Sequence, residues 1–111
     1  MDIQQVQKKL AQFAATRDWD RFHSPKNLCM ALVGEVGELT EHFQWITEEQ
    51  SRQLGADSKR AVGEEIADVL IYTIRLADKL GIDVDRAVRR KMKMNAKKYP
   101  ATLARIVKTS D

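Results

Sequence analysis

The sequence has few of the residues that interrupt helices or cross-link small domains. It contains one cysteine, two prolines and five glycines among 111 residues, and its aromatic content is 6%. A single cysteine excludes an internal disulfide framework and is typical of a reducing compartment, so we expect a cytoplasmic protein in which Cys29, between Leu28 and Met30, is a buried thiol. The scarcity of proline, glycine and aromatic residues favours helices over sheet.

Long apolar runs are also missing. No stretch reaches the ~20 residues that cross a membrane, and residues 1–5 lack the basic and apolar regions of a signal peptide. An apolar fraction of 43% and a charged fraction of 32% are typical of a globular protein rather than a disordered one. At this length we expect one domain over residues 1–111, with a short tail at about 101–111.

Apolar residues recur at helical spacing along four segments. We predict helices at about 3–16, 25–46, 59–80 and 84–98, the third stopped by Gly81. Residues suited to cap a helix N-terminus precede each segment: Asp2, Ser24, Ser58 and Asp83. The pattern predicts an all-α, four-helix bundle. The core stripes of the second and third helices are Leu28, Leu32, Val36, Leu39, Phe43 and Ile46, and Val62, Ile66, Val69, Leu70, Thr73, Ala77 and Leu80.

Two acidic pairs lie within the second and third helical segments. Glu35 and Glu38 are three residues apart, and so are Glu65 and Asp68, so each pair shares one helical face. Neither Lys nor Arg occurs four residues before or after any of them, although ordinary surface carboxylates commonly have such partners. Four unpaired carboxylates in one inter-helix space repel one another unless a hard cation neutralises them. The spacing favours a Mg²⁺ or Mn²⁺ site over plain surface charge.

Other residues flank these acids. Trp19 lies in a polar loop and Trp45 shares the acidic face of the second helix, which is consistent equally with stacking on a planar base and with core packing. The last quarter of the chain is basic, and one helical face there suits phosphate oxygens about as well as it suits plain solvation. Apolar Ile71 and Ile74, on the far side of the third helix, predict a subunit interface.

Several segments match a known pattern. They are an E-x-x-E motif followed by an E-x-x-D motif, Arg17-Asp18-Trp19, Phe22-His23, Pro25 with Asn27-Leu28, the stretch 31–39, Phe43-Gln44-Trp45, Asp68 to Tyr72, Lys91-Met92, Asn95 and Tyr99-Pro100. Together they resemble the MazG-like, all-α nucleoside triphosphate pyrophosphohydrolases, and among these the dCTP pyrophosphatase branch. The likeness extends from about Phe13 to Arg105.

The resemblance implies a Mg²⁺-dependent enzyme that hydrolyses a (deoxy)nucleoside triphosphate, dCTP or a modified pyrimidine deoxynucleoside triphosphate first among them, to the monophosphate and pyrophosphate. It also implies a dimer or a dimer of dimers, with sites built from more than one subunit. The implied metal ligands are Glu35, Glu38, Glu65 and Asp68, with Glu35 or Glu38 as the catalytic base. The implied substrate-binding residues are Trp19, Asp20, Arg21, Phe22, His23, Trp45 and Tyr72 for the base and sugar, and Lys91, Asn95, Lys98 and Tyr99 for the phosphates. Leu10 stands where this branch can present a histidine, which leaves the preferred base open.

Two other functions remain open at this point. A non-catalytic regulatory module could bind a nucleotide through the same residues without cleaving it. A nucleic-acid binder could use the basic last quarter of a chain with a net charge of +3, but four carboxylates facing the same region disfavour that function. We therefore expect a nucleotide substrate, no membrane and no nucleic acid.

Overall fold

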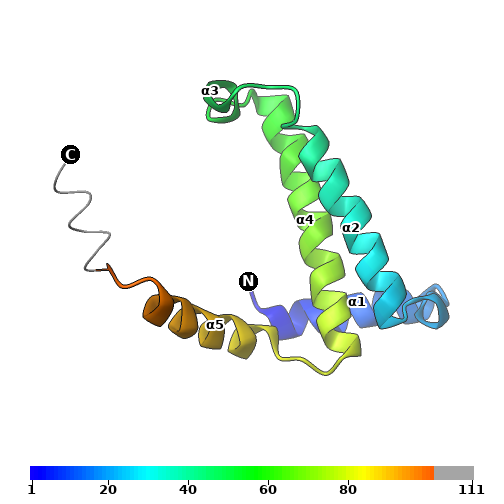
Figure 1. Cartoon of the computed structure of the whole chain (residues 1–111). Coiled ribbons are helices and arrows are strands. Elements are labelled where there is room, and N and C mark those ends of the chain that lie inside the picture. Colours follow the sequence, from blue (N-terminus) through cyan, green and yellow to red (C-terminus); the bar gives the residue numbers. More distant parts are fainter. Residues whose placement is uncertain (102–111) are drawn as a thin grey trace. The chain divides into compact units, whose positions relative to one another are not determined.

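The computed structural model describes residues 1–101, and within them it contains helices and no strand. The helices are α1 (Ile3–Thr16), α2 (Pro25–Glu41), α3 (Glu48–Ser51), α4 (Ala56–Lys79) and α5 (Val84–Lys98), and a 3₁₀ turn, η1 (Asp20–Phe22), joins α1 to α2 (Figure 1). The all-α prediction is confirmed. Most of the tail predicted at about 101–111 lies outside the described residues.

The chain divides into two units. Met1–Gly81 forms one compact unit, and a second unit begins at Ile82 and contains α5. The expected single domain, and a four-helix bundle that includes α5, stay predictions. None of the described helices combines the length and the apolar character needed to cross a membrane.

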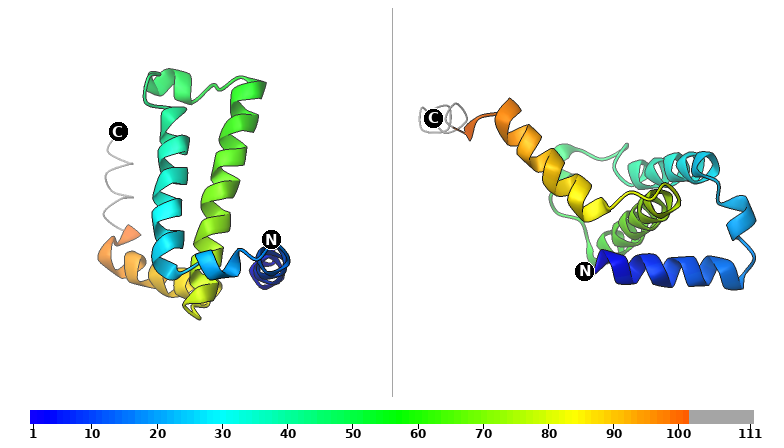
Figure 2. Two further views of the ribbon diagram at one scale, coloured as in Figure 1. Left: turned by 90° about the vertical axis from the view of Figure 1, so that its right-hand side faces the viewer. Right: turned by 90° about the horizontal axis from the view of Figure 1, so that it is seen from below.

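Helix α4 is the central element of the first unit. It runs antiparallel to α2, and α1 crosses it near its C-terminal end (Figures 1 and 2). Both α1 and α2 pack on α4, which contributes three of the five buried apolar side chains. These five are Ala14, Leu28, Val62, Ile74 and Ala77. The core therefore lies along α4, with α2 on one side and α1 on another.

Three of the four predicted N-caps are present. The Asp2, Ser24 and Asp83 side chains each accept a backbone N–H at the start of α1, α2 and α5. The prediction that Ser58 caps the third helix is wrong, because extended Gly55 precedes the first turn of α4 and its carbonyl accepts the N–H of Lys59 at 2.9 Å. Gly81, with a φ of +67°, follows the C-cap of α4 as predicted.

Helix α2 ends at Glu41 rather than near Ile46. The backbone at 42–46 forms turns closed by hydrogen bonds between residues three apart, such as the one from Phe43 N–H to Thr40 C=O at 2.9 Å. Thr47 and Gln50 then form a capping box that begins α3. The apolar periodicity through Phe43 and Ile46 hid this break because it continues across the turn.

Several apolar residues differ in burial from the prediction. Ile74 is buried rather than at an outer interface, because α1 covers α4 at this end. Cys29 is exposed, because it lies about 100° around α2 from buried Leu28. Some residues of the predicted core stripes are about half exposed in the single chain, since one partner helix covers only part of a wide stripe: Val36, Ile66, Leu70 and Leu80.

We expect Leu28→Ala to lower the free energy of unfolding by about 2–5 kcal/mol, because it leaves a cavity at a side chain that is 1% exposed. Urea unfolding at one fixed protein concentration measures this. Cys29→Ala, at the adjacent exposed position, is the control and should stay within about 0.5 kcal/mol of wild type. Equal losses in both variants would contradict the assigned core.

Candidate functional site

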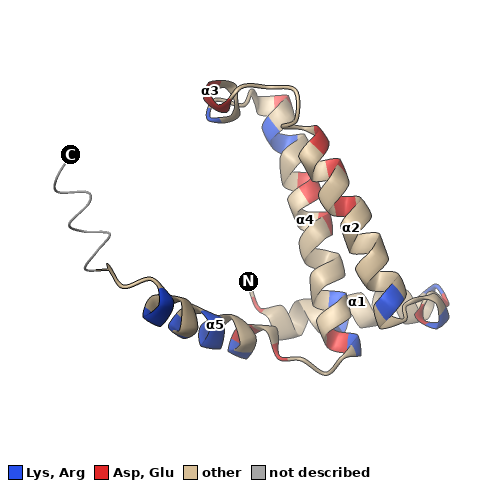
Figure 3. Cartoon of the chain, in the orientation of Figure 1, with Lys and Arg blue, Asp and Glu red and all other residues tan. Residues whose placement is uncertain are grey.

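An acidic cluster lies between α2 and α4. Side-chain oxygens of Glu35 and Glu38, from α2, and of Glu65, from α4, lie within 4.8 Å of one another. Figure 3 shows the acidic segments of the two helices side by side. Asp68, one turn further along α4, is near enough for its charge to raise the pKa of both Glu35 and Glu65. The structure thus brings three of the four predicted metal ligands together and places the fourth beside them.

Two oxygens of the acidic cluster are buried without a partner. Glu35 Oε2 and Glu65 Oε2 are shielded from solvent and accept no hydrogen bond. Burial raises the pKa of both carboxyls, and the hydrogen bond and charge of Glu38 raise them further. His42 opposes this only weakly, with Nε2 3.9 Å from Glu65 Oε1.

These features fit a hard divalent cation. Buried polar atoms nearly always have a partner, so two orphaned carboxylate oxygens on facing helices need an explanation. A cation supplies positive charge and a bond to each oxygen at once. The donors are all oxygen, which suits Mg²⁺ or Mn²⁺ better than Zn²⁺.

A cavity of about 380 Å³ lies next to the acidic cluster. Its apolar lining comes from α1, the following loop and α4, and consists of Leu10, Phe13, Ala14, Trp19, Ile71 and Tyr72. Its polar lining is Lys9, His23, Asp68 and Arg75. Because Asp68 lines this cavity and also lies beside the acidic cluster, a ligand could place an aromatic ring in the cavity and phosphates at the acids.

The turn after α1 positions Trp19. Asp18 has a φ of 54°, a conformation that aspartate tolerates better than most residues. Trp19 N–H donates to Ala14 C=O at 2.9 Å and Asp18 N–H to Ala15 C=O at 3.1 Å, the two bonds of a Schellman motif. The Trp19 ring then meets the Phe13 ring edge-on, with centroids 5.5 Å apart.

A polar network anchors the loop that carries His23. Arg75, which is 5% exposed, donates to Asp20, to Asp78 Oδ2 at 3.4 Å and to His23 Nδ1 at 3.3 Å. Lys79 Nζ donates to Asp20 Oδ1 at 2.7 Å. The hydrogen bond from Lys79, together with the charge of Arg75, holds the pKa of Asp20 below its usual value. Burial, reinforced by the charge of Arg75, lowers the pKa of His23.

Arg75 was not among the predicted site residues. The sequence signal for Arg75 is its position as the one charged residue in the stretch 69–77, next to Ile74, which is also buried. A buried guanidinium needs carboxylate or other acceptor partners. Such a position deserves to be treated as a site candidate even when its partners are more than 50 residues away, as Asp20 and His23 are.

Other predicted substrate-binding residues of the first unit do not line this cavity. The Arg21 guanidinium lies over the exposed Phe22 ring, 4.5 Å from its centroid, and neither residue lines the cavity. Trp45 is 86% exposed in the turn after α2. The remaining predicted residues belong to the second unit and are exposed: Lys91, Asn95, Lys98 and Tyr99.

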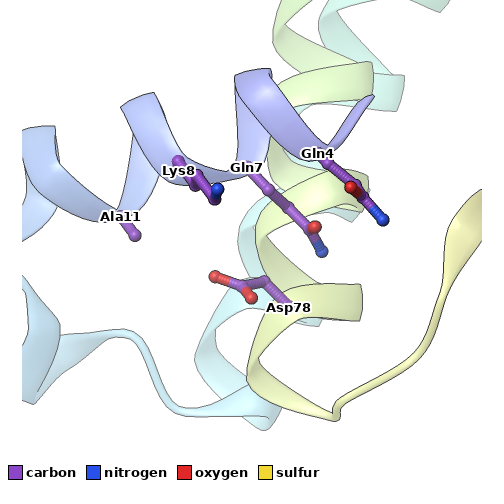
Figure 4. A pocket seen from close by; sticks show the side chains of 5 residues that line it. All are labelled: Gln4, Gln7, Lys8, Ala11 and Asp78. Atoms are coloured by element: carbon purple, nitrogen blue, oxygen red, sulfur yellow. The ribbon is translucent and has the colours of Figure 1, made fainter. Parts of the chain in front are cut away.

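A second hollow, of about 300 Å³, lies between α1 and the end of α4. Figure 4 shows its lining residues: Gln4, Gln7, Lys8 and Ala11 on α1, and Asp78 on α4. Unlike the aromatic cavity, it has no aromatic wall and does not adjoin the acidic cluster. We assign no function to it.

Comparisons with known proteins agree on one family. The profile of the MazG-like family matches residues 31–109. The chain is 47% identical over 105 residues to dCTP pyrophosphatase 1 from Homo sapiens and, equally, to that from Rattus norvegicus, covering 93% of this chain and 62% of each relative. It is 40% identical to a pyrophosphatase from Archaeoglobus fulgidus whose crystal structure superposes with a TM-score of 0.83, covering 90% of this chain and 94% of the other. The chain thus spans 62% of the length of these curated relatives.

The acidic cluster predicts how the stability of the metal-free protein depends on pH. With the pKa of Glu35 raised above 4.5, the folded state keeps a proton that the unfolded state has released. The free energy of unfolding therefore falls as the pH rises from 4.5 through the raised pKa. Glu35→Gln, which cannot ionise, should show a shallower fall in urea unfolding with a chelator present.

The matched control is Glu64→Gln, which removes an exposed neighbouring acid outside the acidic cluster and should keep the wild-type slope. Identical slopes in wild type and Glu35→Gln would show that Glu35 ionises normally in the folded protein.

Proposed function

The chain belongs to the MazG-like family, and from this premise we propose that it is a Mg²⁺-dependent nucleoside triphosphate pyrophosphohydrolase. Its reaction is hydrolysis between the α and β phosphates, which yields a nucleoside monophosphate and pyrophosphate. One observation carries the proposal. Glu35 and Glu65 have buried, unpartnered carboxylate oxygens, and Asp68, which lies beside them, also lines the aromatic cavity. The names of the similar proteins, dCTP pyrophosphatase 1 and pyrophosphatase, support the same reaction.

The proposed metal ligands are Glu35, Glu38, Glu65 and Asp68. A divalent cation bound there supplies Lewis-acid chemistry, because it acidifies water and neutralises phosphate charge. Glu35 or Glu38 accepts the proton of the attacking water. The pKa of Glu35 is raised in the metal-free protein, and a bound cation would favour the ionised carboxylate that a base requires.

The proposed substrate is dCTP or a modified pyrimidine deoxynucleoside triphosphate. Trp19 and Tyr72 offer aromatic surface to a planar base, and His23 offers a polar edge within the same cavity. Lys91, Asn95 and Lys98 recur at i, i+4 and i+7, so they share one face of α5, and all three are exposed. We assign them, with Tyr99, to the phosphates.

We also propose that the enzyme is a dimer or a dimer of dimers and that Trp45 serves the site of a partner subunit. The single chain leaves apolar side chains 39–64% exposed on α2 and α4: Met30, Val33, Val36, Ile66, Leu70 and Ile71. Exposed apolar clusters of this kind are typical of subunit interfaces. Trp45 is 86% exposed, and a partner subunit that covers it or shares a ligand with it would give it a role.

The first test is a panel of canonical and modified nucleoside triphosphates, with and without Mg²⁺, in which pyrophosphate and orthophosphate are resolved. We expect Mg²⁺-dependent pyrophosphate release that is greatest for one pyrimidine. Glu38→Gln and Asp68→Asn should each lower kcat at least about 100-fold, because each removes a proposed ligand, while circular dichroism stays helical. Glu64→Gln, outside the acidic cluster, should retain activity.

Each other outcome has a distinct meaning. Orthophosphate release would overturn the cleavage position. Nucleotide binding without turnover would favour a non-catalytic regulatory module. Full activity in both Glu38→Gln and Asp68→Asn would overturn the assigned acids.

A second test is subunit complementation. Trp45→Ala and Asp68→Asn should each be poorly active alone. If one chain supplies Asp68 and its partner supplies Trp45, a hybrid of the two variants contains one intact site. Differently tagged chains, co-expressed and purified as the hybrid, should regain activity toward the best triphosphate of the panel. A hybrid no more active than its parents would show that Trp45 does not act across the interface.

A further inference from the structure

The buried arginine on α4 has no role in the proposed metal chemistry, yet it contacts the loop that lines the aromatic cavity. Arg75 Nε donates to His23 Nδ1 at 3.3 Å, and its two terminal nitrogens donate to Asp20 and Asp78. Its side chain is 6% exposed. Each of the three guanidinium nitrogens therefore donates to a different residue, and the acceptor of Nε–H is His23 Nδ1.

The hydrogen bond determines which ring nitrogen of His23 carries the proton. Arginine is a donor only and stays protonated in proteins. Nδ1 of His23 must therefore present a lone pair, and the ring is neutral with its proton on Nε2. An imidazolium would place two N–H groups against each other at Nδ1. The lowered pKa of His23, from burial and from the charge of Arg75, agrees with a neutral ring.

We infer that Arg75 is a positioning residue: through its Nε–H···Nδ1 hydrogen bond it holds His23 in the Nε2–H form, so that the cavity recognises a hydrogen-bond acceptor on its ligand. His23 and Arg75 both line the cavity. With Nδ1 occupied, Nε2–H is the polar group of the ring that a bound molecule can meet. The matching group on a pyrimidine is a carbonyl oxygen or an unprotonated ring nitrogen, and an N–H at the same place is rejected.

The part of this inference that concerns the ligand rests on the proposed function, whereas the part that concerns the ring does not. The ring proton can be located in the free protein, without metal or nucleotide. The chain has two histidines, so long-range ¹H–¹⁵N spectra contain two imidazoles, with His42 as an internal reference.

Two substitutions of equal length separate the hydrogen bond from the charge. In Arg75→Gln the amide nitrogen takes the position of Nε and can still donate to His23. In Arg75→Met the same position has no donor. Both remove the positive charge, and in both Asp20 keeps Lys79 as a partner.

Spectra at about pH 8, where the ring is neutral, should show distinct pyrrole-type Nε2 and pyridine-type Nδ1 signals for His23 in wild type and in Arg75→Gln. In Arg75→Met the two ¹⁵N signals should move toward each other as the tautomers mix. Unchanged signals in Arg75→Met, or a Gln variant that behaves like Met, would overturn the inference.

Ligand recognition is measured with the α,β-imido analogue of dCTP, which cannot be cleaved at the proposed bond. Losing one hydrogen bond of ordinary strength corresponds to about a five- to tenfold rise in Kd. We expect that rise in His23→Phe and a smaller rise in Arg75→Met, where only part of the His23 population keeps the Nε2–H form. The double variant should bind no more weakly than His23→Phe, and Arg75→Gln should bind with near wild-type affinity. Additive effects in the double variant would show that Arg75 does not act through His23.

The two proposals fail in different ways. In one case, the triphosphate panel shows no turnover and the analogue does not bind, but His23 shows the expected tautomer. The proposed function is then wrong, and the positioning of His23 by Arg75 is confirmed. In the other case, the panel shows Mg²⁺-dependent pyrophosphate release, but the His23 signals of the wild type show mixed tautomers. The proposed function is then confirmed, and the positioning of His23 by Arg75 is wrong.

Discussion

The burial of unneutralised carboxylates between α2 and α4 is the constraint on which the rest of the first unit depends. Glu35 and Glu65 have oxygens that reach neither solvent nor a donor, which costs stability in the metal-free protein. The core that holds these helices together therefore has to offset the cost. It does so at the ends of the helix pair, with Val62 on α4 before Glu65, and with Leu28, Ile74 and Ala77 near the crossing of α1.

One strip of α4 carries several parts of the candidate site in sequence order. Glu65, Asp68, Tyr72 and Arg75 follow at helical spacing, so they lie along one side of the helix. The strip passes from the acidic cluster, through Asp68, to the aromatic cavity and then to the guanidinium that contacts His23. A straight helix fixes the order and the spacing of these groups without a mobile loop between them, which is the preorganisation that positioning and electrostatic catalysis require.

The sequence predicted the parts of the site that depend on helical period. The acids of α2 and α4 follow from i, i+3 spacing, and the caps Asp2, Ser24 and Asp83 follow from local chemistry. What escaped prediction depends on contacts between distant segments. The Arg75–His23 hydrogen bond joins residues 52 positions apart, and the burial of Ile74 depends on α1 packing against α4. The end of α2 at Glu41 escaped for a local reason, since the apolar pattern continues through Phe43 and Ile46 across the turn that precedes the capping box at Thr47.

The exposed apolar residues connect stability with the proposed site. Within residues 1–101, five buried apolar side chains make a small core, while Val33 on α2 and Leu70 on α4 remain 63% and 44% exposed. Burying such residues against a second copy would add apolar contact on the same two helices that carry the acidic cluster. Association and cation binding would then stabilise one helix pair from two sides, so each should strengthen the other by linkage. In the proposed dimer, the interface would add stability that offsets the cost of keeping the carboxylates close together in the metal-free protein.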